Sequence, residues 1–590
     1  MTTSMWGRIP VTDWLVIMLI AGGLAGVFLG ALRLRVPGWG MLILALLPVL
    51  LIYLVNPHYR IYSRHGLMHV SIVNQVLVHG VPPEAPWLAG QPLAYPWAYH
   101  VLVAGMRSLL YAPASVCFAA INLVCLTGTV VLLSMIAGLI TPDRRTRCFA
   151  VLLALFGMTP FCRGPITHVL KPLFARWVGS PLLVPGVPAV EKFSNVNATP
   201  LGIFFTAWFF YLTLQLLAGG SRPWWRYALL FLAVVGAGYF YPLMFLGLGV
   251  CTGLGGLLAL MYHGRRCIPA VLAYAGCAAA AALVVAPYVL EIASARTAHH
   301  PGLQASWAGV GHNCLRWLGN IGVVLLIAAW EYRRVGGLIR PVHFPWLLLV
   351  VFGMVLGGMY AVLSVPPRNE YKFMMQSALC LGVAGSVLVA GFVQRSRFIA
   401  LPLLTLLLLT FGSDLWARIG HPRPATPLVE TGAGLRHRDP ERNALYTWIA
   451  NETPSDAVFV DTDMWIPVLG RRSLLVGLHV THPGAGKPDL AGWTIPPLLL
   501  LVNIFGYPPD LVESRAQLVQ SLYAAGPIEE TTIAALRRAG ASRPVYVVYA
   551  PAFRPDRLRD DPRFDRVYEH ARYVVYRLRD DVGDTTGPAW

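Results

Sequence analysis

Charged side chains are scarce in this sequence, and their scarcity excludes an ordinary soluble enzyme. Among the 590 residues, 13% are charged and 56% are hydrophobic, whereas about a quarter of a typical soluble domain is charged. No cysteine follows Cys380, so the long C-terminal region cannot form an internal disulfide. We therefore expect a polytopic membrane protein whose nine cysteines, all within or beside apolar segments, serve as small core residues.

Several functional motifs are also missing. The sequence has no Walker motif, no Gly-x-Gly-x-x-Gly after a strand and no Gly-x-Ser-x-Gly. An ATP-driven transporter is therefore disfavoured. The net charge of +18 comes from short clusters of basic residues between apolar runs, a pattern typical of membrane topology signals and not of a nucleic-acid partner.

The apolar runs predict a bundle of about twelve transmembrane helices, because about 20 apolar residues cross a bilayer. A run over 227–261 is long enough for two short helices hinged at Gly238-Tyr-Phe-Tyr-Pro242, since proline cannot continue an unkinked helix. The remaining runs lie at 14–31, 39–55, 116–140, 148–160, 201–218, 268–290, 315–331, 344–364, 373–393 and 398–416.

Arginine clusters give the orientation. Those near residues 143–147, 222–226, 265–266, 333–340 and 395–397 fit one side of the membrane, which should be the cytoplasm. Alternation then places the polar loops and everything after 417 on the opposite side. Residues 97–112 are apolar enough to be a further span, which would place 56–96 in the cytoplasm. Partly because of a resemblance to a known family, we instead expect a helix at the outer interface, with Tyr95, Trp97 and Tyr99 as belt aromatics, and the protein to lie in a bacterial plasma membrane.

The composition changes after residue 417, where charged and turn residues increase. We therefore divide the chain into a transmembrane domain, 1–416, whose first outer loop is 56–115, and a soluble extracytoplasmic α/β domain, 417–590. A helix is expected to begin after the cap residue Asp439. A second helix is expected over 531–539, and strands over 457–460, 473–476, 545–549 and 573–577.

The first outer loop contains the most conspicuous polar residues. His65 and His69 would project from one face of a helix. They fit three interpretations: substrate or acid/base residues, hydrogen-bonded structural histidines, or part of a divalent metal site, which we do not favour. The metal site would need further ligands, for which the candidates are His79, Glu84 and His100.

The proline-rich segment 81–96 must follow an extended path, because proline restricts its own backbone and that of the preceding residue. It is either a stiff connector or a rigid wall. As a wall it would present Glu84, Tyr95 and Trp97 to a sugar, whose C–H faces stack on aromatic rings.

Two further outer loops carry basic residues suited to binding phosphate. The second outer loop holds Lys171, Glu191, Lys192, Asn195 and Asn197; lipid head groups and helix caps are the structural alternatives. The loop before residue 373 holds Arg368, Glu370 and Lys372. These three are costly near a membrane unless they face a cavity or one another, so either an ion pair of Glu370 or a phosphate site is expected.

This organisation resembles the GT-C superfamily of integral membrane glycosyltransferases, including lipid A aminoarabinose transferases and protein O-mannosyltransferases. The resemblance covers nearly the whole chain as architecture. Its first-loop pattern, Asp-x-x-x-(Tyr/His) followed by Gly, matches at His69 and at Gly80, fifteen residues after His65. His65 therefore stands where the resemblance implies an acid, and Leu93-Ala-Tyr-Pro-Trp97 matches the start of the following interfacial helix.

The resemblance implies sugar transfer from a polyprenyl-phosphate donor to a cell-envelope glycan, lipid or protein outside the cytoplasm. It implies Glu84 or Glu370 as base, assisted by His65, with Arg368, Lys372 and Lys171 on the phosphate. The other expected substrate contacts are His69, Tyr95, Trp97, Glu191, Lys192, Asn195 and Asn197. The alternatives are a catalytically silent binding or assembly component of an envelope polysaccharide system and, third, a transporter or flippase.

Overall fold

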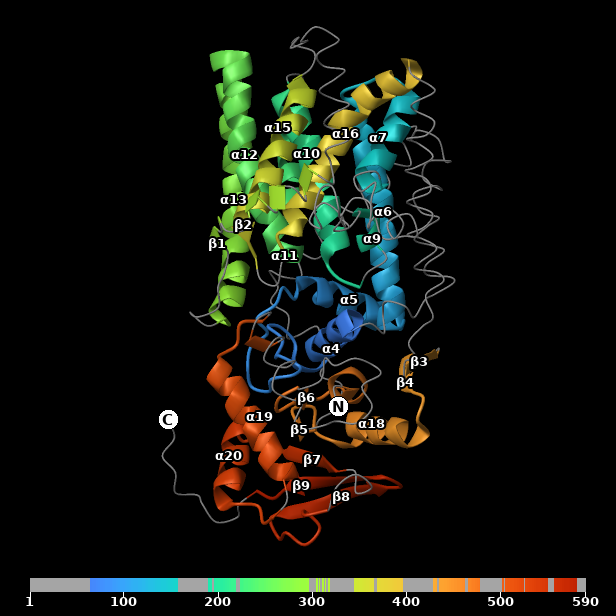
Figure 1. Cartoon of the computed structure of the whole chain (residues 1–590), viewed down its shortest axis with the longest axis vertical. Helices are drawn as coiled ribbons and strands as arrows, with labels where there is room; N and C mark the ends of the chain where they lie inside the picture. The colour runs from blue at the N-terminus through green and yellow to red at the C-terminus, as the bar shows by residue number, and fades with distance from the viewer. Residues whose placement is uncertain are drawn as a thin grey trace, which may run out of the picture.

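The protein was analysed as a computed structural model, which describes residues 64–156, 189–193, 196–218, 223–296, 304–305, 307, 310–311, 313–314, 317–318, 344–365, 369–395, 428–431, 434–461, 465–477, 501–502, 505–524, 526–549 and 556–580. The molecule is elongated (Figure 1). A bundle of long helices forms one end, a mixed sheet with flanking helices forms the other, and two short helices lie between them. The predicted fold class, a helical membrane bundle with a C-terminal α/β domain, is confirmed.

Apolar composition explains the bundle, because a helix that is hydrophobic all round must be buried or face lipid. Among the described residues, five helical stretches are long and apolar enough to cross a membrane, so the protein is an integral membrane protein. The bundle helices are α6 (Ala114–Gly138), α7 (Arg144–Phe156), α10 (Thr199–Leu217), α11 (Trp224–Phe240), α12 (Pro242–His263), α13 (Ile268–Ser294), α15 (Phe344–Val362) and α16 (Tyr371–Arg395). The predicted runs at 14–31, 39–55 and 398–416, and most of 315–331, lie outside the described residues.

The predicted hinge between two helices in 227–261 is confirmed. Helix α11 ends at Phe240, Tyr241 has a non-helical backbone (φ −148°, ψ 77°), and Pro242 begins α12 because its missing N–H is harmless in a first turn. Helix α10 packs tightly on this hinge, since a Cβ atom at Gly202 would lie 2.9 Å from Tyr241 Cβ. Tyr241 is thereby held close to the first turn of α10.

Two helices of the first outer loop, α4 (Arg64–His79) and α5 (Ala98–Leu110), lie between the bundle and the C-terminal sheet (Figure 1). With 13 residues, α5 is about 20 Å long, which is too short to cross a bilayer. The prediction that 97–112 is an extra helix and not a span is therefore confirmed. Residues 80–97, which we call the strap, join the two helices without helical structure.

The C-terminal sheet has five strands in the order β6-β5-β7-β9-β8. Strands β6 (Ser473–Leu474), β5 (Val458–Val460) and β7 (Val545–Tyr549) are parallel. Strands β9 (Tyr573–Leu578) and β8 (Phe564–His570) extend the sheet in antiparallel fashion. Four strands were expected and are confirmed, whereas β8 was not, because its alternating charged residues look like an exposed loop.

The helices of this domain are α18 (Pro440–Glu452), α19 (Pro509–Tyr523) and α20 (Glu530–Gly540). The expected cap of α18 is confirmed, because the Asp439 carboxylate accepts a hydrogen bond from the Glu441 N–H at 3.0 Å. Helix α19 was not predicted. The shorter elements are α9 (Ala189–Lys192), η3 (Gly264–Cys267), η5 (Ile466–Gly470), and the antiparallel pairs β1 (Gln304–Ala305) with β2 (Leu363–Ser364) and β3 (Leu428–Thr431) with β4 (Gly434–His437).

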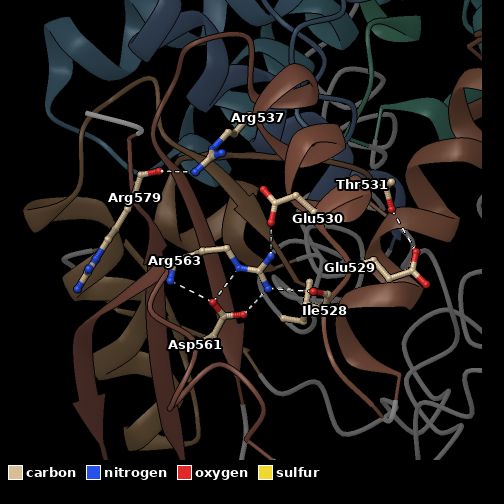
Figure 2. Close-up of polar contacts among 8 residues, drawn as sticks. All are labelled: Ile528, Glu529, Glu530, Thr531, Arg537, Asp561, Arg563 and Arg579. Atoms are coloured by element: carbon tan, nitrogen blue, oxygen red, sulfur yellow. Dashed lines mark hydrogen bonds and ion pairs between the residues drawn. The ribbon is translucent and has the colours of Figure 1, made fainter. Parts of the chain in front are cut away.

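An ion-pair network fastens the start of α20 to the chain just before β8 (Figure 2). The Arg563 guanidinium contacts Asp561 and Glu530, both at 2.7 Å, and donates to the Ile528 carbonyl at 2.9 Å. The hydrogen bonds from Arg563 hold the pKa of the Asp561 carboxyl below its ordinary value. This network stabilises the soluble domain internally.

The strap is attached to the edge of the C-terminal sheet. The Ala89 N–H donates to the Leu474 carbonyl at 2.9 Å, and the Leu474 N–H donates to the Pro86 carbonyl at 3.0 Å. Because Leu474 belongs to edge strand β6, the strap covers the unpaired backbone of that strand. Direct backbone pairing also requires the first outer loop and the C-terminal domain to lie in the same compartment.

Candidate functional site

Two lysines meet at the loop-facing end of the bundle. Lys192 ends the short helix α9, and Lys372 lies in the first turn of α16. The two ammonium groups lie 4.8 Å and 4.3 Å from the centroid of one ring, that of Tyr371. Lys192 is 7% exposed and Lys372 is 2% exposed, so both charges lie away from bulk water, where their interaction with an anion is strongest.

Residues of α10 and of the hinge complete this group. The Lys372 ammonium donates to the Thr199 hydroxyl at 2.9 Å and lies 5.1 Å from the centroid of the Tyr241 ring. The Thr199 N–H donates to the Asn197 side-chain oxygen at 2.8 Å, so Asn197 helps to cap α10, the alternative role considered for it. We call Lys192, Thr199, Tyr241, Tyr371 and Lys372 the lysine cluster.

The helix directions add to the positive potential of the lysine cluster. Thr199, Tyr371 and Pro242 are the first residues of α10, α16 and α12, and the N-terminus of a helix carries a partial positive charge. Two buried ammonium groups beside three helix N-termini form a site suited to a phosphate or another anion.

A second group lies on the first outer loop. His69 of α4 and His100 of α5 are fully buried, with His69 Nδ1 2.7 Å from His100 Nε2 and with stacked rings. Tyr95 and Phe118 pack edge-on against His69. The two facing nitrogens share one proton, because two N–H groups at this distance would repel each other. We call these two residues the histidine pair.

Tyr95 packs against both residues of the histidine pair, with its ring centroid 6.0 Å from that of His69 and 6.1 Å from that of His100. Burial raises the pKa of Tyr95 to about 12, and the nearby Arg296 opposes this shift only in part, so the hydroxyl stays protonated at neutral pH. Trp97 packs edge-on against Tyr288 of α13. Trp97 is buried and Tyr95 is half-buried, and the role of both aromatics in binding a sugar stays a prediction.

Glu84 is held elsewhere, at the junction with the C-terminal domain. One oxygen accepts the Gly90 N–H at 2.6 Å, and the other lies 2.8 Å from Arg543 Nη1. Glu370 precedes α16, and its carboxylate accepts the Val365 N–H at 3.3 Å. The roles of Glu84 and Glu370 as base remain predictions, and the structure does not bring Glu84 into contact with the lysine cluster among the described residues.

Several predicted site residues cannot be placed. Lys171, Asn195 and Arg368 lie outside the described residues, as do the side chains of His65 and Glu191. Of the described side chains, no three or more His, Cys, Asp or Glu gather as a metal site. The structure therefore brings together Lys192, Lys372 and Asn197 in one place, and His69 with Tyr95 in another.

Sequence reasoning missed five residues of these groups as site residues, among them Tyr371, which lies between two residues that were predicted. His100 had been considered only as a metal ligand, and Tyr241 only as part of the hinge. Thr199 lies in a segment that the sequence singled out, directly before an apolar run, and this was its only signal. Arg543 is more than 450 positions from Glu84, and nothing in either local sequence indicates the pairing.

Comparison of the structure with solved proteins shows a GT-C-like fold and, at these low identities, the fold alone. The arabinofuranosyltransferase AftD from Mycobacteria is similar over 92% of this chain and 40% of its own, with a TM-score of 0.53 and 14% identity. ArnT from Cupriavidus metallidurans is similar over 91% of this chain and 98% of its own, with a TM-score of 0.44 and 13% identity. No protein-family model and no curated protein matches the sequence.

Proposed function

We propose that the protein is a membrane glycosyltransferase that moves a sugar from a polyprenyl-phosphate donor to a glycan, lipid or protein acceptor outside the cytoplasm. The observation that carries the proposal is the convergence of Lys192 and Lys372 on Tyr371 at three helix N-termini, at the loop-facing end of a bundle with a GT-C-type fold. An apolar lipid tail would lie against the membrane-spanning helices, which leaves its phosphate at this end.

The lysine cluster would act on the leaving group. As the bond between the anomeric carbon and the phosphate oxygen breaks, negative charge grows on the phosphate, and buried cations already in place stabilise that charge. The Thr199 hydroxyl holds the Lys372 ammonium at 2.9 Å, which limits its motion during the reaction. Lys171 and Arg368 remain predicted phosphate ligands of the same site.

The acceptor hydroxyl must lose a proton as it attacks the anomeric carbon, so the reaction needs a base. Glu370 is the candidate nearest in sequence to the lysine cluster, two residues before Lys372. His65 is one turn before His69 on α4 and could pass a proton toward the histidine pair. Glu84 is the third candidate base, although its contacts with Gly90 and Arg543 hold it at the strap.

The test is transfer by the purified protein in liposomes, with a panel of labelled polyprenyl-phosphate sugars and an envelope extract as acceptor. We expect transfer from at least one donor, and a loss of about 100-fold in Lys372→Gln because a stabilising cation is removed. Arg265→Gln is the matched control, since this exposed arginine lies at the opposite end of α12 from Tyr241. Full activity of Lys372→Gln would contradict the site assignment.

The second candidate function is a catalytically silent component that binds the lipid phosphate. It is favoured by one observation: Glu84 is the only carboxylate in residues 56–115, and Arg543 already pairs with it. A silent protein would bind a polyprenyl-phosphate sugar in a manner that depends on Lys372 and would transfer nothing from any donor in the panel. Turnover by the wild-type protein would exclude this candidate.

A further inference from the structure

Several backbone hydrogen bonds join the strap to the C-terminal domain. Besides the pairing of Ala89 and Pro86 with Leu474, the Gly477 N–H donates to the Trp87 carbonyl at 2.6 Å. The strap also folds on itself, since the Ala85 N–H donates to the Gln91 carbonyl at 2.8 Å. The strap is thus a small hairpin whose turn is laid against edge strand β6.

The Glu84 side chain fastens this hairpin at two points. Its Oε1 atom accepts the Gly90 N–H and closes the turn, where Gly90 has a φ of +76° that favours glycine. Its Oε2 atom accepts from Arg543 of the C-terminal domain at 2.8 Å. Both side chains are 15% exposed, so this ion pair is less screened by water than a surface pair.

Arg515 of α19 forms a second connection, in which its guanidinium binds neutral backbone carbonyls instead of a carboxylate. It is 8% exposed, and its Nη1 atom donates to the Ala89 carbonyl at 2.6 Å and to the Leu475 carbonyl at 3.0 Å. One guanidinium therefore bridges the strap and the sheet. Figure 1 shows α19 beside the sheet, with one end near the strap.

The hydrogen bonds between the strap and the C-terminal domain determine the position of the last residues of the strap. Tyr507 of the C-terminal domain accepts the Ala94 N–H at 3.1 Å and donates to the Pro92 carbonyl at 2.9 Å. The next residues are Tyr95, which contacts the histidine pair, and Trp97, which precedes α5. A displaced strap would therefore move the aromatic residue that packs against both histidines of the histidine pair.

We propose that Glu84 and Arg543 are positioning residues: their ion pair fixes the strap on the C-terminal domain and so places Tyr95 for the reaction, and Glu84 does not accept the acceptor's proton. This inference rests on the proposed glycosyl transfer for its catalytic consequence. Both Glu84 oxygens already accept hydrogen bonds, and taking up a proton there would remove the negative charge that pairs with Arg543, which would weaken the contact that holds the strap.

Two single variants and their combination test the proposal. Glu84→Gln keeps an oxygen for the Gly90 N–H, and Arg543→Gln removes the cation. If the two residues act through their one shared contact, each single variant should lower kcat by about tenfold. The double variant should then lower kcat no further than a single variant does, because the effects of coupled residues are not additive. For Glu84 as base, Glu84→Gln alone should lose about 100-fold or more, and Arg543→Gln should add an independent loss.

The pH dependence of turnover distinguishes a general base from a positioning residue. If Glu84 were the base, Glu84→Gln would remove the acidic limb of the pH–rate profile; for a positioning residue the limb stays where it is. A matched control is Glu530→Gln, which breaks an ion pair with Arg563 at the other end of α20 from Arg543. This variant should transfer sugar at the wild-type rate.

Thermal unfolding of the full-length variants in detergent separates this inference from the proposed function. If no donor supports transfer, the proposed function fails, yet the positioning contact still predicts that the double variant loses no more stability than the single ones. Additive losses of stability from Glu84→Gln and Arg543→Gln, or loss of the acidic limb in Glu84→Gln, would overturn the inference.

Discussion

The lysine cluster and the strap junction, where residues 80–97 meet the C-terminal domain, both contain cations away from bulk water. The two regions bind these cations through different kinds of partner. At the strap junction, Arg543 binds a carboxylate and Arg515 binds two carbonyls. In the lysine cluster, Lys372 is held by a hydroxyl and by the faces of two tyrosines. A carboxylate partner neutralises a cation, whereas carbonyl, hydroxyl and aromatic partners are themselves uncharged. The comparison contrasts an ion pair that joins two segments of the chain with a cluster that we propose binds an anion.

The largest effect is expected where both lysines are removed. Lys372→Gln alone should lower turnover by about 100-fold, and Lys192→Gln with Lys372→Gln by less than the product of the single losses, because both ammonium groups would act on one phosphate. The measurement is donor turnover in the liposome assay. Independent, multiplicative losses would show that the two lysines serve different groups.

Gly477→Ala should disrupt the strap junction by overpacking. A Cβ atom there would lie 2.5 Å from Trp87 Cβ, and the Gly477 N–H is already bound to the Trp87 carbonyl. We expect a loss of about 1–3 kcal/mol in the free energy of unfolding, measured by thermal denaturation. The control is Gly105→Ala in helix α5, where the structure places nothing within 4 Å of the new atom and the backbone is helical. Equal losses in the two variants would argue against a tight strap contact.

Thr199→Val should weaken the lysine cluster without removing a charge. The hydroxyl that holds the Lys372 ammonium at 2.9 Å is lost, and a hydrogen bond to a charged group contributes about 1.5–3 kcal/mol. We expect turnover to fall by about tenfold, less than for Lys372→Gln. Thr199→Ser, which keeps the hydroxyl, should retain most of the activity. If both variants behave alike, the hydroxyl does not position the lysine.

The smallest effect concerns pH at the strap junction. Burial lowers the pKa of His79, at the end of α4, below 6.5; Glu84 and Asp456 oppose this shift, and Arg543 and Arg472 support it. The folded protein therefore binds this proton more weakly than the unfolded chain. The contribution of His79 to stability is complete above pH 6.5 and declines as the pH falls through its lowered pKa. Unfolding measured against pH should show this decline in the wild type and less of it in His79→Gln.

Much of the fold could be predicted from composition and periodicity alone. The helices of the bundle, the hinge before Pro242 and the cap at Asp439 all follow from local preferences: apolar length, the missing proline N–H and a carboxylate at a helix start. Helix α19 was missed because its mixed polar sequence owes its position to packing on the sheet. The site was harder, because Lys372 was predicted together with Arg368 and Glu370, whereas its contacts are with residues of two other helices.

The sequence by itself determined that this is a membrane protein, where the apolar helices of the bundle lie and that basic residues lie at the ends of particular ones, since each of these depends on neighbouring residues along the chain. Only the tertiary structure decided that Lys192 and Lys372 share the Tyr371 ring, that His69 faces His100, and that Glu84 pairs with Arg543. Such contacts depend on the packing of segments that are far apart in the chain, and their energies are invisible in any local pattern. The first outer loop was predicted as the reactive part of the molecule, and its only carboxylate holds the loop in place.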